Sequence, residues 1–290
     1  MRLLPLLALT VLLAACDRGV APPQGKPAPE RPERPAHADM VPVSGGPFPM
    51  GSDRVDTEDR WKEFGSRRPW YLDEHPRRLL TLGPFLIDRT EVTEGAFARF
   101  VNDYGYNPPP HWKDGAPERP EHPVINVNWM DAQNYCHWRG ARLPTEAEWE
   151  KAARGTNGRE YPWGDGFERD RANVGQLGDT TEAGHFPEGA GPYGTLDQAG
   201  NVWEWTASWY QAYPGSGHPD PDFGRRAKVL RGGSSGGKGG HYQLEQLTSR
   251  TGYRFFLDPR ARVADVGFRC AQAIDSSGNP IGDHQDRLHG

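Results

Sequence analysis

The spacing of apolar residues predicts helices in the first half of the chain. Thr93 carries the hydroxyl that an N-cap needs, and apolar residues recur after it at helical intervals, at Phe97, Phe100, Val101 and Tyr104. Two further helix starts show a cap residue followed three positions later by an acid, the capping-box pattern. They are Asn128 with Asp131, before a helix whose buried face includes Trp129, Ala132, Tyr135, Cys136 and Trp138, and Thr145 with Glu148, before a helix that runs through Arg154.

Short apolar runs bounded by Gly and Pro predict strands. Helical periodicity nearly vanishes after Gly155, and the charged and aromatic residues 53–75 indicate a loop. The polar residues 274–290 indicate a frayed tail. Short strands and about three helices, joined by long loops, place the chain in the α+β class. The strands are predicted at 41–52, which includes a Gly-Pro turn, at 77–82 and 85–88 around a second Gly-Pro turn, at 228–231 and at 266–270.

Composition narrows the function without naming it. The 290 residues suffice for one large domain or two small ones, and 36 Gly with 28 Pro are many for a helical protein. Ten Trp indicate a core built on large aromatic side chains. The net charge of -5 offers no basic surface to nucleic acid, so we expect no nucleic-acid partner.

The N-terminus has the pattern of an exported lipoprotein. Residues 3–13 form an apolar run too short to span a membrane as a mature helix. Leu-Ala-Ala-Cys at its end resembles a bacterial lipobox, so residues 1–16 are the predicted signal peptide and Cys16 the predicted lipidation site. Asp17 is compatible with retention in the inner membrane. The alternative is an ordinary secretory signal in which Cys16 is incidental.

The next segment indicates where the protein works. Residues 17–39 are rich in Pro and charge and contain a single Val, so they bury too little surface to fold. They are the predicted disordered linker between the membrane and the folded domain. We therefore expect a lipid-anchored protein of the bacterial cell envelope that faces the periplasm.

The stretch Gly-Asn-Val-Trp-Glu-Trp at 200–205 combines a turn with an acid between two Trp. Gly and Asn permit a tight turn, and a carboxylate among aromatic rings needs a partner when buried. Asp197, the carbonyls of the turn and Glu204 could converge on one cation, and calcium takes such oxygen ligands. The alternative is a Trp-rich core turn whose Glu204 accepts hydrogen bonds from backbone amides.

A series of short motifs extends over residues 40–273. They are Gly51-Ser52, the strand and helix at 85–100, His-Pro-Val-Ile-Asn-Val-Asn-Trp at 122–129, Arg-Leu-Pro-Thr-Glu-Ala-Glu-Trp at 142–149, Tyr-Pro-Trp-Gly at 161–164, the stretch at 200–205, Leu-Arg-Gly-Gly-Ser at 230–234 and Gly-Phe-Arg-Cys at 267–270. In this order they resemble the formylglycine-generating enzyme (sulfatase-modifying factor) family. The resemblance implies one domain at 40–273 with a C-type-lectin-like, loop-rich fold that often binds calcium.

The resemblance also implies two calcium sites. At the second of these sites the family usually has Asp followed by Gly and an aromatic residue, whereas this chain has Asp-Thr-Thr at 179–181. The first site matches Asp197, Gly200, Val202 and Glu204, the middle two through their carbonyls, and the second matches Asn173, the carbonyl of Val174, and Asp179.

The cysteines separate this chain from the active members of the family. Cys136 and Cys270 remain after lipidation, and an exported pair favours a disulfide over two free thiols. The family has a bridge at the same two positions. Formylglycine-generating enzymes also bind copper through two cysteines shortly after the Gly-Gly-Ser turn, and thiolates suit Cu(I). Here those positions are Gly237 and Tyr242, and residues 137–269 contain no Cys, so copper and formylglycine generation are not expected.

Other residues could line the groove that the resemblance implies. His241 and Tyr242 follow the Gly-rich run 236–240, and His is a possible base or metal ligand, although a lone loop His is more often neither. Their expected neighbours, which complete the set of catalytic candidates, are Ser234, Trp203, Arg250 and Arg254. Glu146 and Glu148 are better explained by capping and an exposed helix face than by acid–base chemistry.

Two functions remain open. In the first, the domain is a non-catalytic module whose groove binds a ligand, a peptide or a protein partner of the envelope. In the second, it is a periplasmic oxidoreductase or maturation enzyme with altered, non-Cys chemistry, as in family relatives that take part in siderophore maturation. The missing cysteines and the long linker favour the first.

Overall fold

The computed structural model describes residues 39–63, 69–236 and 245–281, all of which fall within one compact unit that begins at Ala36. Among these residues no helix is long and apolar enough to cross a membrane. The predicted Cys16, signal peptide and linker lie outside the described part, as do His241 and Tyr242.

Three helices of at least nine residues begin where their caps predict. Thr93 Oγ1 accepts a hydrogen bond from the amide of Ala96, at 3.2 Å. Asn128 and Thr145 each form a complete capping box with the acid three positions later. The helices are α1 (Arg60–Glu63), α2 (Glu94–Tyr104), α3 (Trp129–Trp138), α4 (Glu146–Arg154) and α5 (Glu245–Thr248), with 3-10 turns at Leu72–Glu74, Lys113–Gly115, Arg169–Arg171 and Pro187–Gly189.

Nine short strands form three sheets within the described residues, all with antiparallel pairing except β5 with β8. The first sheet has the order β1-β4-β9, the second β2-β3 and the third β7-β6-β5-β8. The strands are β1 (Met40–Val43), β2 (Gly46–Met50), β3 (Arg78–Leu82), β4 (Phe85–Asp88), β5 (Trp203–Trp209), β6 (Lys228–Arg231), β7 (Phe255–Leu257), β8 (Val266–Gly267) and β9 (Ala271–Ala273).

The structure corrects several expectations. β3 and β4 flank the predicted Gly-Pro turn, yet they do not pair, because β3 pairs with β2 and β4 with β1. Residues 203–209 form a central strand of the third sheet rather than the second half of a turn. Tyr104 was expected on the buried face of α2 but is 69% exposed, because it lies in the last turn of the helix.

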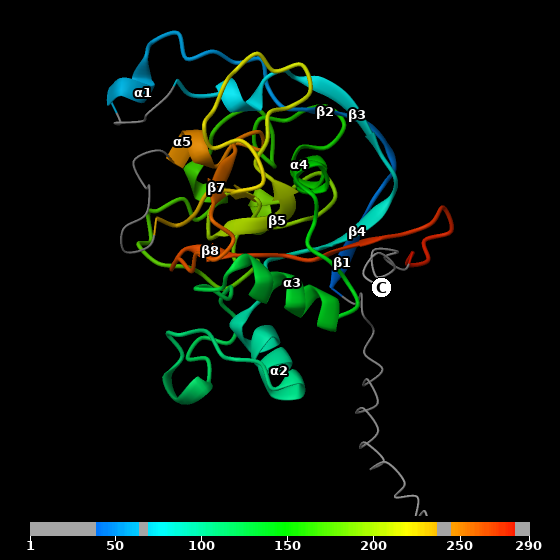
Figure 1. The fold of residues 1–290 in the computed structure, drawn as a ribbon, viewed down its shortest axis with the longest axis vertical. Helices are drawn as coiled ribbons and strands as arrows, with labels where there is room; N and C mark the ends of the chain where they lie inside the picture. The colour runs from blue at the N-terminus through cyan, green and yellow to red at the C-terminus, as the bar shows by residue number, and fades with distance from the viewer. Residues whose placement is uncertain (1–38, 64–68, 237–244, 282–290) are drawn as a thin grey trace, which may run out of the picture. The chain divides into compact units, whose positions relative to one another are not determined.

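The largest core cluster contains the disulfide between Cys136 and Cys270. Both cysteines are fully buried, and the bond joins α3 to the segment between β8 and β9. Figure 1 shows α2 and α3 side by side, and the stacked rings of Phe97 and Tyr135, with centroids 5.6 Å apart, fill the space between them. The covalent link and the aromatic packing therefore hold together segments far apart in the sequence.

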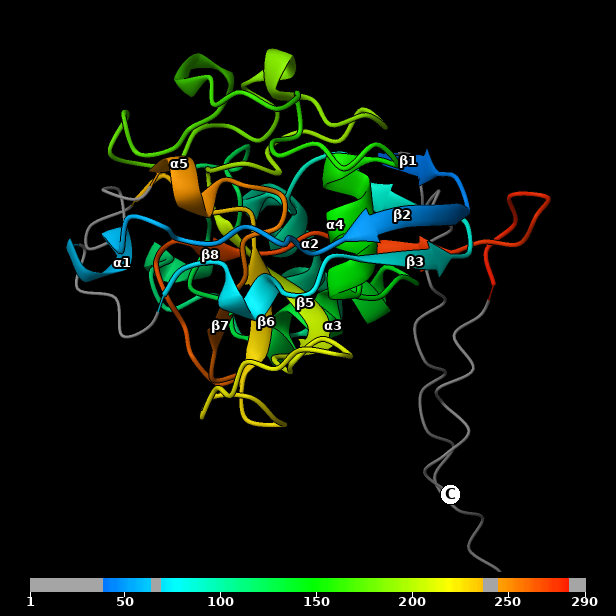
Figure 2. The same ribbon diagram turned by 90° about the horizontal axis from the view of Figure 1, so that it is seen from above.

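Helix α4 is buried on all sides. It contacts β2, β5 and β6, and Figure 2 shows it beside β2. Glu146 is 5% exposed and Glu148 is 9% exposed, so the expectation of an exposed helix face was wrong. Glu148 caps the helix as expected, whereas Glu146 is an ion-pair partner. A buried charged helix needs partners from elsewhere in the chain.

Removing the disulfide should lower stability markedly. The bond closes a loop between residues 134 positions apart, and the chain-entropy model gives about 4 kcal/mol for such a loop. We expect the Cys136→Ala/Cys270→Ala variant to lose about this much free energy of unfolding, measured by urea denaturation. The unsubstituted chain under reducing conditions is the matched control and should lose a similar amount. A loss below about 1 kcal/mol in both would contradict the bridge's stabilising role.

Candidate functional site

The carboxylate of Glu204 lies at the centre of the candidate site. Arg269 Nε and Nη2 each donate to a different carboxylate oxygen of Glu204 at 2.7 Å, and Trp149 Nε1 donates to one of them at 2.8 Å. These donors are side chains and not the backbone amides of the alternative interpretation. Arg269 also donates to the carbonyls of Asp88, Arg89 and Leu196.

The turn before β5 is held in a conformation that only small residues adopt easily. Gly200 has a φ of 84°, and a Cβ there would lie 2.2 Å from the carbonyl oxygen of Asn173. Asn201 follows with a φ of 59°, and its amide donates to the same carbonyl at 2.7 Å. The turn is also joined to the Gly-Gly-Ser segment, since the amide of Ser235 donates to the carbonyl of Asn201.

A second and a third carboxylate lie close to Glu204. Asp197 is 6% exposed, and its side chain accepts a hydrogen bond from the amide of Gly184. Glu91 is 2% exposed and lies within hydrogen-bonding reach of the carboxyl group of Asp197. Arg269 is the arginine that counters these charges, so the cluster has an excess of negative charge.

The pKa values reflect this imbalance. Burial raises the pKa of Glu91 well above its usual value, and the charge of Asp197 raises it further. Burial also raises the pKa of Asp197 and that of Glu204, against the opposing effect of Arg269. For Arg269, burial opposes the charged form, but the charge of Glu204 outweighs it and raises the pKa.

The residues of the predicted second calcium site only partly converge. Asn173 is 1% exposed, and its side-chain nitrogen donates to the carbonyl of Asp179 at 2.8 Å. The carboxylate of Asp179, however, accepts from Arg119 at 3.0 Å and from the amide of Thr180. The amide of Val174 is bound by Gln176. Asn173 and Asp179 are therefore neighbours, but the carboxylate is engaged elsewhere.

Two buried oxygens near the turn have no hydrogen-bond donor. They are Oε2 of Glu91 and Oδ1 of Asn173. The described residues contain no group of three His, Cys, Asp or Glu side chains arranged to hold a metal ion. A cation here would therefore depend on turn carbonyls as much as on carboxylates, which is how calcium is often held. The donor set fits calcium, because it offers oxygens that lack partners.

The structure does not assemble a catalytic group from the described groove candidates. Ser234 Oγ donates to Asp265 at 2.9 Å. Trp203 is buried and packs on Phe255, with ring centroids 5.0 Å apart. Arg250 is buried and binds both carboxylate oxygens of Glu74, at 2.8 and 3.0 Å.

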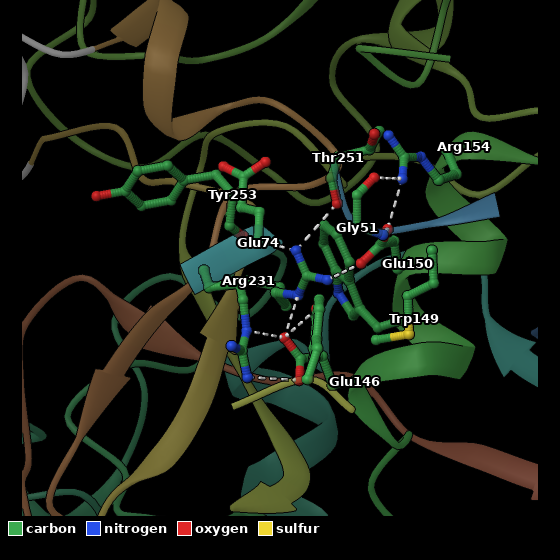
Figure 3. Close-up of polar contacts among 12 residues, drawn as sticks. Gly51, Glu74, Glu146, Trp149, Glu150, Arg154, Arg231, Thr251 and Tyr253 are labelled. Carbon is green, nitrogen blue, oxygen red and sulfur yellow. Dashed lines mark hydrogen bonds and ion pairs between the residues drawn. The ribbon is translucent and has the colours of Figure 1, made fainter. Parts of the chain in front are cut away.

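Arg254 belongs instead to a buried ion-pair network around α4. Its Nε and Nη2 donate to Glu146 at 2.7 and 3.1 Å. Figure 3 shows Arg231 between Glu146 and Glu150, where it also donates to the carbonyls of Thr251 and Tyr253. Burial opposes ionisation of Glu146, but the charges of Arg254 and Arg231 outweigh it and lower the pKa. The arginines expected in the groove are therefore structural.

Comparison with known proteins agrees with this fold and with these motifs. The sequence profile of the sulfatase-modifying factor enzyme 1-like domain matches residues 25–274. The chain belongs to this family. The enzyme family that the motifs resemble is thereby confirmed, as is the loop-rich fold with mixed helix and sheet.

Relatives in the family include proteins named as inactive and proteins named as formylglycine-generating enzymes. An inactive C-alpha-formylglycine-generating enzyme 2 from Mus musculus is 34% identical, over 83% of this chain and 87% of the relative. The formylglycine-generating enzyme of Thermomonospora curvata is also 34% identical, over 80% of this chain and 92% of the relative. The structure of PvdO from Pseudomonas aeruginosa aligns with a TM-score of 0.62 at 26% identity, over 81% of this chain and 94% of that one.

Sequence reasoning assigned no role to two residues of the site. Glu91 and Arg269 both lie within the family motifs, but their partners are distant in sequence. Glu91 is 110 positions from Asn201, which donates to it, and Arg269 is 65 positions from Glu204. The available signal was weak: Arg269 is a charged residue between the apolar Phe268 and Cys270, whereas Glu91 follows the polar Thr90 and precedes Val92.

Replacing Arg269 should strongly destabilise the domain. Arg269→Met leaves the Glu204 carboxylate buried without its cation, which typically costs about 3–5 kcal/mol. Arg269→Met/Glu204→Gln should recover part of this loss, because the uncompensated charge is removed. Arg260→Met is the matched control, since its pair with Asp258 is exposed and worth at most about 1 kcal/mol. Equal effects of the Arg269 and Arg260 variants in urea denaturation would refute this role of Arg269.

Proposed function

We propose that this chain is a non-catalytic, calcium-stabilised member of the family that binds a ligand or protein in the bacterial envelope. Lipid on Cys16 would anchor it to a membrane, with the domain facing the periplasm. The observation that carries the proposal is the absence of cysteine between Cys136 and Cys270, which removes both thiolates that copper would need.

The structure supports the proposal through its arginines. Arg250 and Arg254 both donate to buried carboxylates, and each is at most 4% exposed. Neither is available to bind a substrate or to stabilise developing charge. A frame held by such pairs can instead present a fixed groove to a peptide or an envelope protein, because binding needs shape and not reactive groups.

Calcium would stabilise this frame. Asp197 and Glu204, with the carbonyls of Gly200 and Val202, are the proposed ligands at the turn. Glu204 keeps acceptor capacity, because Oε2 accepts from both Trp149 and Arg269 whereas Oε1 accepts from Arg269. When bound, calcium supplies charge that offsets the buried carboxylates. Asn173, with Val174 and Asp179, forms the second proposed site, which would need the Asp179 carboxylate to leave Arg119.

One observation favours a second function. The hydroxyl of Ser234, just before the Gly-rich run 236–240, donates to the carboxylate of Asp265. Asp265 is 8% exposed. A serine and an acid in this position are compatible with altered, non-Cys chemistry in an oxidoreductase or maturation enzyme of the periplasm. His241 and Tyr242 would be the first additional residues to test.

The chain should not generate formylglycine. Incubating the purified full chain with a Cys-containing sulfatase peptide, copper, oxygen and a reductant should give no aldehyde by mass spectrometry, because no thiolate pair is present to hold copper. The enzyme of Thermomonospora curvata serves as the positive control. Conversion above the enzyme-free background would disprove the proposal.

Metal analysis separates the two functions. We expect calcium and no stoichiometric iron or copper in the purified full chain, measured by inductively coupled plasma mass spectrometry. Chelation should lower the melting temperature by roughly 5–10 °C relative to calcium at about 100 times its dissociation constant. Magnesium at the same ionic strength is the control. Stoichiometric iron or copper would instead favour the enzyme.

A further inference from the structure

Glu91 is held rigidly although it belongs to no helix or strand. The amide of the next residue, Val92, donates to the carbonyl of Phe268 at 2.9 Å, and the carbonyl of Val92 accepts from Val124. On the other side, the carbonyl of Arg89 accepts from the amide of Leu196 at 2.7 Å. This last bond brings the backbone of Glu91 beside that of Asp197, so the approach of the two carboxyl groups is fixed by the fold.

The two oxygens of Glu91 have different surroundings. Oε1 accepts from Asn201 Nδ2 at 3.1 Å. Oε2 is buried and has no donor, and the neighbouring carboxyl group of Asp197 is itself an acceptor when ionised. Two acceptors that face each other require either a proton or a cation between them.

Glu204 is less free to take this cation than Glu91. Its carboxylate already receives bonds from both Arg269 and Trp149. Asn201, in contrast, connects Glu91 to the turn, because its amide nitrogen binds Glu91 while its own backbone forms the turn between Gly200 and Val202. The bond from Asn201 to Oε1 therefore places the carboxyl group of Glu91 beside the turn, and the unpartnered Oε2 belongs to the same carboxyl group.

We propose that Glu91 is a direct calcium ligand, which joins Asp197 and Glu204 as a further negatively charged ligand of the turn site. The inference rests on the proposed calcium-stabilised function and adds a residue from outside the turn. It assigns Glu204 mainly to Arg269, with at most one oxygen left for the ion. The ion then links the segment after β4 to the turn before β5, two segments more than a hundred residues apart.

The test compares calcium affinity in matched variants of the full chain. Calcium is titrated into chelator-treated protein, and binding is followed by calorimetry and by tryptophan-sensitised terbium luminescence, for which Trp149 is a nearby donor. Glu91→Gln should weaken calcium binding at least about tenfold, since ligand charge tunes calcium affinity. The calcium-free variant should be at least as stable as the unsubstituted chain, because the Gln amide can donate to Asp197. Glu94→Gln is the control, because Glu94 is equally buried but binds His111 and the amide of Arg119.

Each outcome decides one claim. Unchanged calcium affinity in Glu91→Gln would overturn the ligand role and would indicate that Glu91 and Asp197 share a proton. If the unsubstituted chain shows no saturable response to calcium, both this inference and the calcium part of the proposed function are overturned. The peptide assay tests the loss of catalysis separately. If Glu91→Gln does not fold, Glu91→Asp keeps the charge but withdraws the oxygen by one methylene, and the same loss of affinity is expected.

Discussion

The buried pair of Arg269 and Glu204 is the interaction on which the other features of the site depend. One guanidinium holds the carboxylate of β5 and the carbonyls of Asp88, Arg89 and Leu196, so it fixes the end of β4 and the segment before the turn at once. Neither charge would be tolerated alone at full burial. Glu91 and Asp197 come just after Arg89 and Leu196 in the sequence, and Arg269 binds the carbonyls of both. The geometry of the cluster is therefore a consequence of the pair of Arg269 and Glu204.

Two buried charge networks in the domain differ in their balance. Around α4, the three arginines Arg154, Arg231 and Arg254 bind the two acids Glu146 and Glu150, and backbone carbonyls accept from several of their other donors. Around the turn, three carboxylates are countered by Arg269, and an oxygen of Glu91 has no donor. In the first network every carboxylate is paired with at least one arginine, so the network is structural. The second has a deficit of positive charge, and this deficit favours a cation there and not around α4.

Local features of this fold were predictable from sequence, and long-range ones were not. The caps at Thr93, Asn128 and Thr145 act within three residues, so the local sequence pattern was enough to predict them. The helices begin directly after these residues. β5 was missed because its first four residues, at 203–206, are buried on both faces and show no alternation. Glu146 looked exposed because its partner Arg254 is 108 positions away. At the site, the turn carried a visible pattern, but its partners Glu91 and Arg269 did not.

Within the described residues, the bonds that hold the turn at 200–202 involve no cysteine. The Gly-Gly-Ser segment is fixed by bonds from Gly200 to the carbonyl of Gly232 and from Ser235 to the carbonyl of Asn201. The scaffold around the turn therefore does not require a cysteine between Cys136 and Cys270. A chain without such a cysteine can keep the turn in place through the buried pair of Arg269 and Glu204 and through the backbone bonds of the Gly-Gly-Ser segment, because none of these contacts needs a thiol.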